Sequence, residues 1–141
     1  LEETLPSIID GTNASIPQDE DLVTYSPTLS REDERIDWNL SSREIYNKVR
    51  GMNGLPGSYT TYLGKTVKIW AGKVHQCENA VKHHAHQDNG TIVKIFKDAI
   101  GVKVNDGVYL ITELQVEGKK KMLVKDYLNG HCVFEVNSKF E

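Results

Sequence analysis

Cysteine, proline and long apolar runs are all scarce in this sequence. Its 141 residues include two cysteines and four prolines, and no apolar run approaches the roughly 18 residues of a membrane-spanning helix. No basic segment followed by an apolar one marks a secretion signal. The sequence therefore gives no support to a disulfide scaffold, a membrane protein or a secreted protein, and we expect a cytoplasmic location.

Motifs for catalysis are missing as well. We find no Ser-His-Asp set, no paired carboxylates and no glycine-rich phosphate loop, so we expect no catalytic residue in this chain. His83, His84 and His86, with His75 and Cys77 nearby, are the one group of metal-ligand side chains. Their segment is polar and lacks a closed four-ligand pattern, so we expect no metal. A metal-binding domain is kept as an alternative.

Charge is distributed unevenly along the chain. The net charge is −3, but residues 1–40 hold ten acidic and two basic side chains, a balance of −8. Residues 41–141 hold ten acidic and fifteen basic side chains, a balance of +5. Such asymmetry is a hint of an anionic partner, although a solvated lysine surface is the commoner cause.

The charge boundary coincides with a change of pattern. Residues 1–12 read as the end of a helix from a preceding domain, with apolar positions at helical spacing up to Ile9 and Gly11 as a stop signal. Residues 13–40 are polar and predict an extended linker. Residues 41–141 carry the periodic segments and predict one folded domain.

The folded domain should begin with a helix and continue as a sheet. Ser41 and Glu44 form a capping-box pattern ahead of Ile45, Val49 and Met52, which share one helical face. After Pro56 the hydrophobic period changes from helical to alternating. Strands are expected at about 58–63, 66–75, 90–96, 100–104, 107–116 and 132–136, with a short helix at about 122–128.

These strands and their turns predict the fold class. Asn105-Asp106-Gly107 is a good tight-hairpin signal, so the pairing should be antiparallel. We predict a mainly β chain with short helices, an α+β fold, built as a small antiparallel barrel of five to six strands like the oligonucleotide-binding fold and preceded by the linker. A β-sandwich is the alternative, because strand number alone does not fix topology.

A series of short motifs also runs through the chain in order. They are Glu3-Thr4-Leu5-Pro6, Pro17-Gln18-Asp19-Glu20, Thr24-Tyr25-Ser26-Pro27, Arg35-Ile36-Asp37-Trp38, Arg50-Gly51-Met52-Asn53, Pro56-Gly57-Ser58-Tyr59-Thr60, Lys68-Ile69-Trp70, Gly90-Thr91-Ile92, Asp106-Gly107, Leu114-Gln115, Gly118-Lys119-Lys120-Lys121-Met122 and Asp126-Tyr127-Leu128-Asn129-Gly130. Each motif is weak alone. Their ordered combination resembles the C-terminal half, with the interdomain linker, of bacterial methionyl-tRNA formyltransferases.

The resemblance implies a two-domain enzyme that moves a formyl group from 10-formyltetrahydrofolate to the methionine of initiator tRNA. In that family the donor site and the catalytic residues lie in an N-terminal Rossmann-like domain. The present chain would then bind no cofactor and catalyse nothing alone. Its partners would be initiator Met-tRNA and that N-terminal domain, within a monomer. The alternative is the C-terminal structural domain of another folate-dependent formyltransferase or hydrolase.

The candidate tRNA contacts are basic side chains of the predicted loops and strands. Lysine and arginine suit phosphate, a contact that carries no base identity. The candidates are Lys119, Lys120 and Lys121 between a strand and a short helix, Arg50 at a helix end, Lys65 and Lys68 on a hairpin, and Arg31 in the linker. Structural roles stay open for several of them: a solvated lysine loop, a helix-dipole role for Arg50, and edge protection by Lys65 and Lys68.

Two positions depart from the family pattern. Gly54 stands where a proline is common, and Thr28 stands where the linker often has a lysine, a charge that Arg31 could partly replace.

The two tryptophans have more than one possible role. Trp38 and Trp70 could stack on bases, but their apolar neighbours favour a place in the core. We expect the segment around Trp38 to dock the linker onto the barrel.

Overall fold

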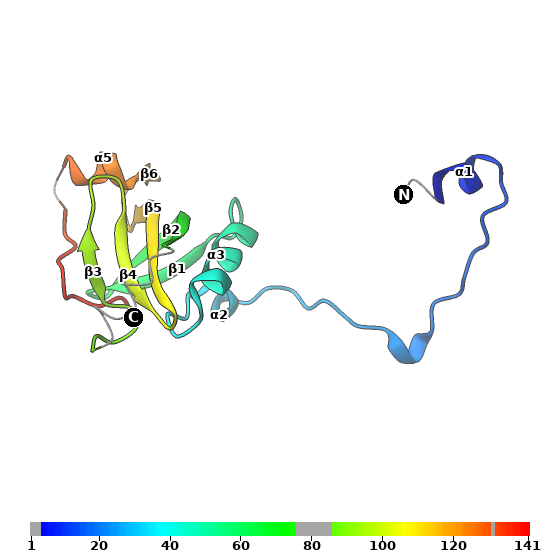
Figure 1. Cartoon of the computed structure of the whole chain (residues 1–141), viewed down its shortest axis with the longest axis horizontal. Helices are drawn as coiled ribbons and strands as arrows, with labels where there is room; N and C mark the ends of the chain where they lie inside the picture. Colours follow the sequence, from blue (N-terminus) through cyan, green and yellow to red (C-terminus); the bar gives the residue numbers. More distant parts are fainter. Residues whose placement is uncertain (1–3, 76–85, 131) are drawn as a thin grey trace.

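The computed structural model describes residues 4–75, 86–130 and 132–141. An N-terminal arm with helix α1 (Thr4–Ile9) and the 3-10 turn η1 (Glu20–Leu22) extends away from a folded body (Figure 1). The helix buries no residue, and Gly11 follows it at φ 68°, as the stop signal predicted. A further short helix, α2 (Arg31–Glu34), lies where the arm reaches the body.

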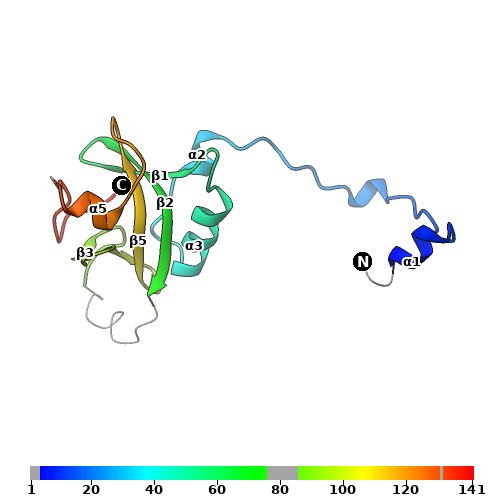
Figure 2. The ribbon, with the colours of Figure 1, turned by 90° about the horizontal axis from the view of Figure 1, so that it is seen from above.

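The body is a six-stranded antiparallel sheet in the order β1-β2-β5-β4-β3, with β6 added to β5. Figure 2 shows helices α3 and α5 on opposite sides of β2 and β5. The prediction of a mainly β, barrel-like fold is confirmed. The bounds are β1 (Ser58–Tyr62), β2 (Lys65–His75), β3 (Ile92–Ile95), β4 (Ile100–Val104), β5 (Gly107–Val116), β6 (Met122–Leu123), α3 (Ser42–Gly51) and α5 (Val124–Leu128).

At the C-terminal end one predicted element is confirmed and one is wrong. The helix expected at about 122–128 is α5, and it begins at Val124 because Met122 pairs with Leu114 of β5. The strand expected at 132–136 is absent from the described residues of that segment. Its backbone amides find side-chain partners instead: Val133 N–H donates to the Tyr127 hydroxyl, and Glu135 N–H donates to that of Tyr62.

Residues 137–141 join the two edges of the sheet. The Asn137 and Phe140 amides donate to carbonyls at Ile92 and Gly90, beside β3. Thr61 of β1 and Glu141 exchange two backbone hydrogen bonds, of 3.0 and 2.9 Å. This segment therefore supplies the backbone partners that exposed sheet edges lack, which is how barrel-like folds avoid edge-to-edge aggregation.

Helix α3 begins as the sequence predicts. The Ser41 hydroxyl accepts from the Glu44 amide, and the Glu44 carboxylate accepts from the Ser41 amide, completing the capping box. The Ser41 hydroxyl also donates to the Glu44 carboxylate at 2.6 Å, and this bond, followed by that of the Ser41 amide, lowers the pKa of Glu44. Ile45 and Val49 are buried against the sheet. The helix thus covers β2 and β5 with its apolar face.

The predicted linker contributes to the core. Ile36 is 2% and Trp38 5% exposed, and the Trp38 indole N–H donates to the Thr60 hydroxyl at 3.0 Å. Between them, the Asp37 carboxylate accepts from the Asn39 amide, so Asp37 is a local hydrogen-bond acceptor. Trp38 stacks on Phe140 with 5.7 Å between ring centroids. The linker and the C-terminal segment therefore meet through two aromatic side chains.

Phe140→Ala should test how much this aromatic contact stabilises the body. Phe140 is 1% exposed and packs on Trp38, Tyr62 and Phe134. Its truncation should lower the free energy of unfolding by about 3–5 kcal/mol, measured by denaturant titration. Val136→Ala, at a side chain 48% exposed, is the control and should change it by less than about 0.5 kcal/mol. Equal effects of the two variants would contradict a central role for Phe140.

Candidate nucleic-acid interface

Trp70 occupies a β-bulge in the central strand pair. Ile69 pairs with Leu114 and Ala71 with Glu113, so Trp70 is an extra residue without a partner on β5. The indole N–H donates to the Gln115 side-chain oxygen at 3.2 Å, and the residue is 9% exposed. Trp70 is therefore buried, as the sequence predicts, but it lies at the rim of the core.

Two lysines approach the Trp70 ring, Lys68 from β2 and Lys121 from the loop before β6. The Lys68 ammonium lies 5.5 Å and the Lys121 ammonium 4.9 Å from the ring centroid. Lys68 also donates to the Pro56 carbonyl at 2.8 Å, and Lys121 pairs with Glu113 at 3.2 Å. Because cation–π attraction holds ammonium groups near an indole, Trp70 gathers two positive charges that are far apart in the sequence.

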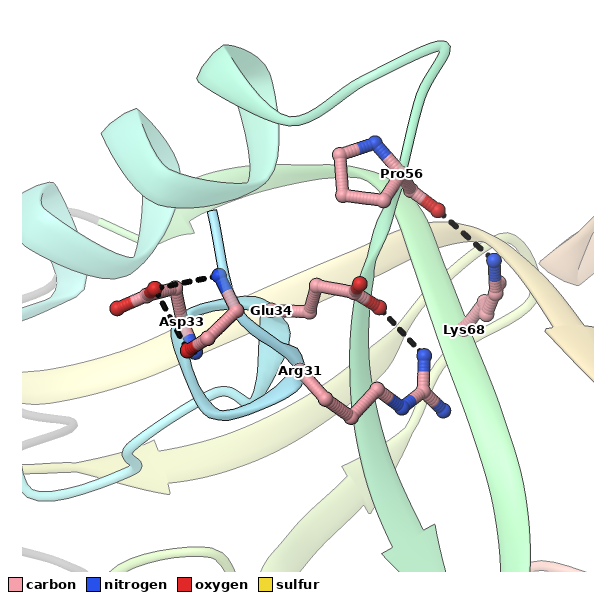
Figure 3. Close-up of polar contacts among 6 residues, drawn as sticks. Arg31, Asp33, Glu34, Pro56 and Lys68 are labelled. Atoms are coloured by element: carbon pink, nitrogen blue, oxygen red, sulfur yellow. Dashed lines mark hydrogen bonds and ion pairs between the residues drawn. The ribbon is translucent and has the colours of Figure 1, made fainter. Parts of the chain in front are cut away.

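Arg31 extends this group across β1. Its guanidinium carbon lies 3.9 Å from the centroid of the Tyr59 ring, and Tyr59 is the β1 partner of Lys68. Figure 3 shows Arg31 paired with Glu34 beside the strand that carries Lys68. We call Arg31, Tyr59, Lys68, Trp70 and Lys121 the Trp70 strip. It alternates cations with aromatic rings, as surfaces that bind single-stranded nucleic acids do.

The other predicted contacts lie outside this strip. Lys119 is directed toward α5, with its ammonium 5.2 Å from the Tyr127 ring. Lys120 is exposed, without a hydrogen bond or ion pair to the described residues. Lys65 pairs with Tyr62 at the hairpin end, and by strand alternation it shares the phase of buried Val67, not that of Lys68. The three consecutive lysines therefore do not form one group: Lys119 lies near Tyr127, Lys120 is exposed, and Lys121 lies near Trp70.

Arg50 has a place that fits both of its predicted roles. It is exposed in the last turn of α3, where a cation complements the helix dipole. It also borders a cavity that Trp70 lines.

The sequence predicted Arg31, Lys68 and Lys121 of the Trp70 strip but missed Tyr59, although the alternation of basic and aromatic residues was a usable signal.

Two carboxylates accompany the cations of the strip. Arg31 and Lys121 are about half exposed, with relative side-chain accessibilities of 52% and 43%, whereas their partners Glu34 and Glu113 are 14% and 24% exposed. A phosphate would therefore approach the exposed sides of the two cations, where a charge-assisted hydrogen bond can form beside the existing ion pair.

Another cleft does not share this character. It has a volume of about 810 Å³ and lies between the linker and the C-terminal segment. Asp37, Asp88 and Glu141 line it together with Lys48 and Lys139, and Lys139 is paired with Asp88 at 3.0 Å. Acidic and basic groups alternate there, so the cleft does not favour a polyanion.

Across residues 4–75, 86–130 and 132–141, no group of three or more histidine, cysteine, aspartate or glutamate side chains is placed to hold a metal ion. His83, His84 and Cys77 lie outside the described residues. No helix of the described part is long and apolar enough to cross a membrane.

Comparisons with known proteins agree on one family. Residues 28–132 match the model of the formyl transferase C-terminal domain. Over 92% of its length the chain is 41% identical to the methionyl-tRNA formyltransferases of Staphylococcus aureus strains MW2 and Newman, and it spans 40% of their length. A variant of HypX from Aquifex aeolicus is similar in fold, with a TM-score of 0.59 at 20% identity over 91% of this chain and 22% of that chain.

Two glycines in the loop before β1 offer a test of the packing around Trp70. Both have positive φ, 102° at Gly54 and 84° at Gly57, so alanine at either should cost about 1–2 kcal/mol in backbone strain. A Cβ on Gly57 would also lie 2.7 Å from the Trp70 ring, whereas one on Gly54 would meet nothing within 4 Å.

Gly57→Ala should therefore destabilise the protein by roughly 1–3 kcal/mol more than Gly54→Ala, because the ring must move. Denaturant titrations of both variants, followed by tryptophan fluorescence, measure the difference. If the two alanine variants are equally stable, the ring does not pack on Gly57.

Proposed function

Because this chain belongs to the formyl transferase C-terminal domain family, we propose that it is the tRNA-holding part of a methionyl-tRNA formyltransferase. The resemblance predicted from the sequence is confirmed by the family match and by the 41% identity to methionyl-tRNA formyltransferases. The likeness to HypX, one structure of which contains tetrahydrofolic acid, is 20% in sequence. It supports the fold and gives the alternative formyltransferase no further weight.

In the complete enzyme, this chain would orient the substrate and a separate domain would carry out the transfer. That domain, expected to be Rossmann-like and N-terminal, would bind 10-formyltetrahydrofolate and hold the catalytic residues. The C-terminal barrel would bind initiator Met-tRNA so that the methionyl amino group reaches the formyl donor. We expect the chain alone to be inactive, to bind no cofactor, and to act in a monomeric cytoplasmic enzyme.

The Trp70 strip is the single observation that carries this proposal. Its three cations come from the linker, from β2 and from the loop before β6, and its rings hold them on adjoining strands. Lysine binds phosphate as a point charge, and arginine can bind it with two parallel hydrogen bonds. The strip would therefore hold an RNA backbone in place without reading its sequence.

Salt dependence of tRNA binding tests the strip. The chain should bind initiator tRNA with a dissociation constant of about 10⁻⁴–10⁻⁶ M near physiological salt. The double variant Lys68→Ala/Lys121→Ala should reduce the slope of log affinity against log salt by roughly 1.4–1.8, since each phosphate contact contributes about 0.7–0.9. Fluorescence anisotropy over a salt series measures both quantities.

The matched control is Lys94→Ala/Lys97→Ala, which removes the same charge at β3 and its following turn, at the other side of the sheet. This control should keep the wild-type slope. Equal loss of slope in both double variants would show that net charge acts without the strip. Absence of binding to initiator tRNA at low salt would defeat the proposed function.

A further inference from the structure

A second, smaller cavity lies between α3 and the central strands. Its volume is about 200 Å³, below the roughly 300–1,000 Å³ of pockets for drug-sized ligands. It therefore has room for a single ring system. The lining residues are Tyr46, Val49, Arg50, Asn53, Trp70, Ala71, Gly72 and Tyr109. Trp70 belongs both to this cavity and to the Trp70 strip.

The Tyr109 hydroxyl is the unusual group of this cavity. Tyr109 is 0% exposed, and its hydroxyl is the one buried side-chain oxygen or nitrogen left without a hydrogen-bond partner among the residues described. Burial raises the pKa of Tyr109, so the group stays protonated and can donate. A buried donor without an acceptor is costly and rare, which points to a partner that binds from outside the chain.

Gly72 lets this hydroxyl reach the cavity wall. A Cβ at Gly72 would lie 2.3 Å from the hydroxyl oxygen, so the oxygen occupies the space that a side chain would fill. Gly72 and Tyr109 both line the cavity, and the hydroxyl oxygen lies beneath its surface, with less than 1 Å² of accessible area. Any residue larger than glycine would displace it.

The remaining walls suit a flat heteroaromatic ring. Tyr46, Trp70 and Tyr109 are aromatic, and Ala71 is the small residue beside them, since the space over Gly72 is filled by the Tyr109 hydroxyl. Arg50 and Asn53 are exposed and supply hydrogen-bonding groups at the mouth. Unstacked RNA bases are held by this combination of aromatic faces and edge-directed polar groups.

We propose that this cavity accepts one unpaired base of the bound RNA, whose flanking phosphates lie on the Trp70 strip. The proposal rests on the proposed function and deepens it, because it names the part of the RNA that the domain would grasp. An acceptor atom of the base would satisfy the Tyr109 hydroxyl after a shift of the side chains that cover it, and Arg50 would be near the phosphate that follows the base.

Filling the cavity tests the proposal without removing charge. Ala71→Leu should weaken binding of initiator tRNA by about 5- to 150-fold, the range for losing one stacked base, while the salt slope stays at the wild-type value. Ala14→Leu, the same change at an exposed position of the arm, should bind as the wild type does. Wild-type affinity of a folded Ala71→Leu variant would overturn the inference.

Tyr109→Phe supplies a second test that does not depend on that variant. It removes the hydroxyl and nothing else, so the melting temperature should stay the same or rise while tRNA affinity falls about tenfold, as expected for one lost hydrogen bond of roughly 1–1.5 kcal/mol. A lower melting temperature would overturn the inference, because it would show that a trapped water already satisfies the hydroxyl. Unchanged tRNA affinity would overturn it as well.

The two proposals fail in different ways. Loss of the base cavity leaves the lysine-dependent salt slope in place, so a wild-type affinity of Ala71→Leu and Tyr109→Phe would overturn the inference and keep the proposed function. A normal slope in Lys68→Ala/Lys121→Ala, together with weaker binding by the two cavity variants, would do the reverse.

Nuclear magnetic resonance with free nucleosides gives an independent readout, in which shifts of the Gly72 amide should vanish in Ala71→Leu. Absence of such shifts in the wild-type chain would overturn the inference.

Discussion

The antiparallel pairing of β2 with β5 is the interaction on which the rest of the domain depends. The pairing runs from Val67 opposite Val116 to His75 opposite Val108, and β1, β4 and β6 are each added to one of these two strands. Helix α3 packs across both. The bulge at Trp70 interrupts this pair near its middle, so the same strand that builds the core also presents an aromatic ring at the rim.

The segments that close the body show little hydrophobic periodicity in the sequence. Ile36 and Trp38 reach the core from a stretch that is otherwise polar, and Phe140 meets Trp38 from the far end of the sequence. The linker is therefore a structural part of the barrel at its C-terminal end, even though its N-terminal part is exposed. This fixes Arg31, which lies shortly before the first buried position, next to β1.

Local patterns predicted the elements that local forces determine. Strands β4 and β5, the Asn105-Asp106 turn and the Ser41 capping box all depend on neighbours a few residues away, and all are found, although every residue of β4 is buried and not only every second one. The C-terminal segment was misread because its backbone bonds to Tyr62 and Tyr127, whose proximity no local pattern reveals. The sequence identified Lys68 and Lys121 as candidates. For the same reason it did not reveal that both approach the same indole ring.

In the proposed complex, the division of roles around Trp70 would let this domain hold a large polyanion in a defined orientation. The three cations of the strip would attract phosphate, and such contacts alone would leave an RNA free to slide. A rigid ring in a bulge, hydrogen-bonded to Gln115 and packed on Gly57, cannot follow that sliding. One inserted base would fix the register of the whole backbone, because phosphate contacts position a nucleic acid only after something has selected where it starts.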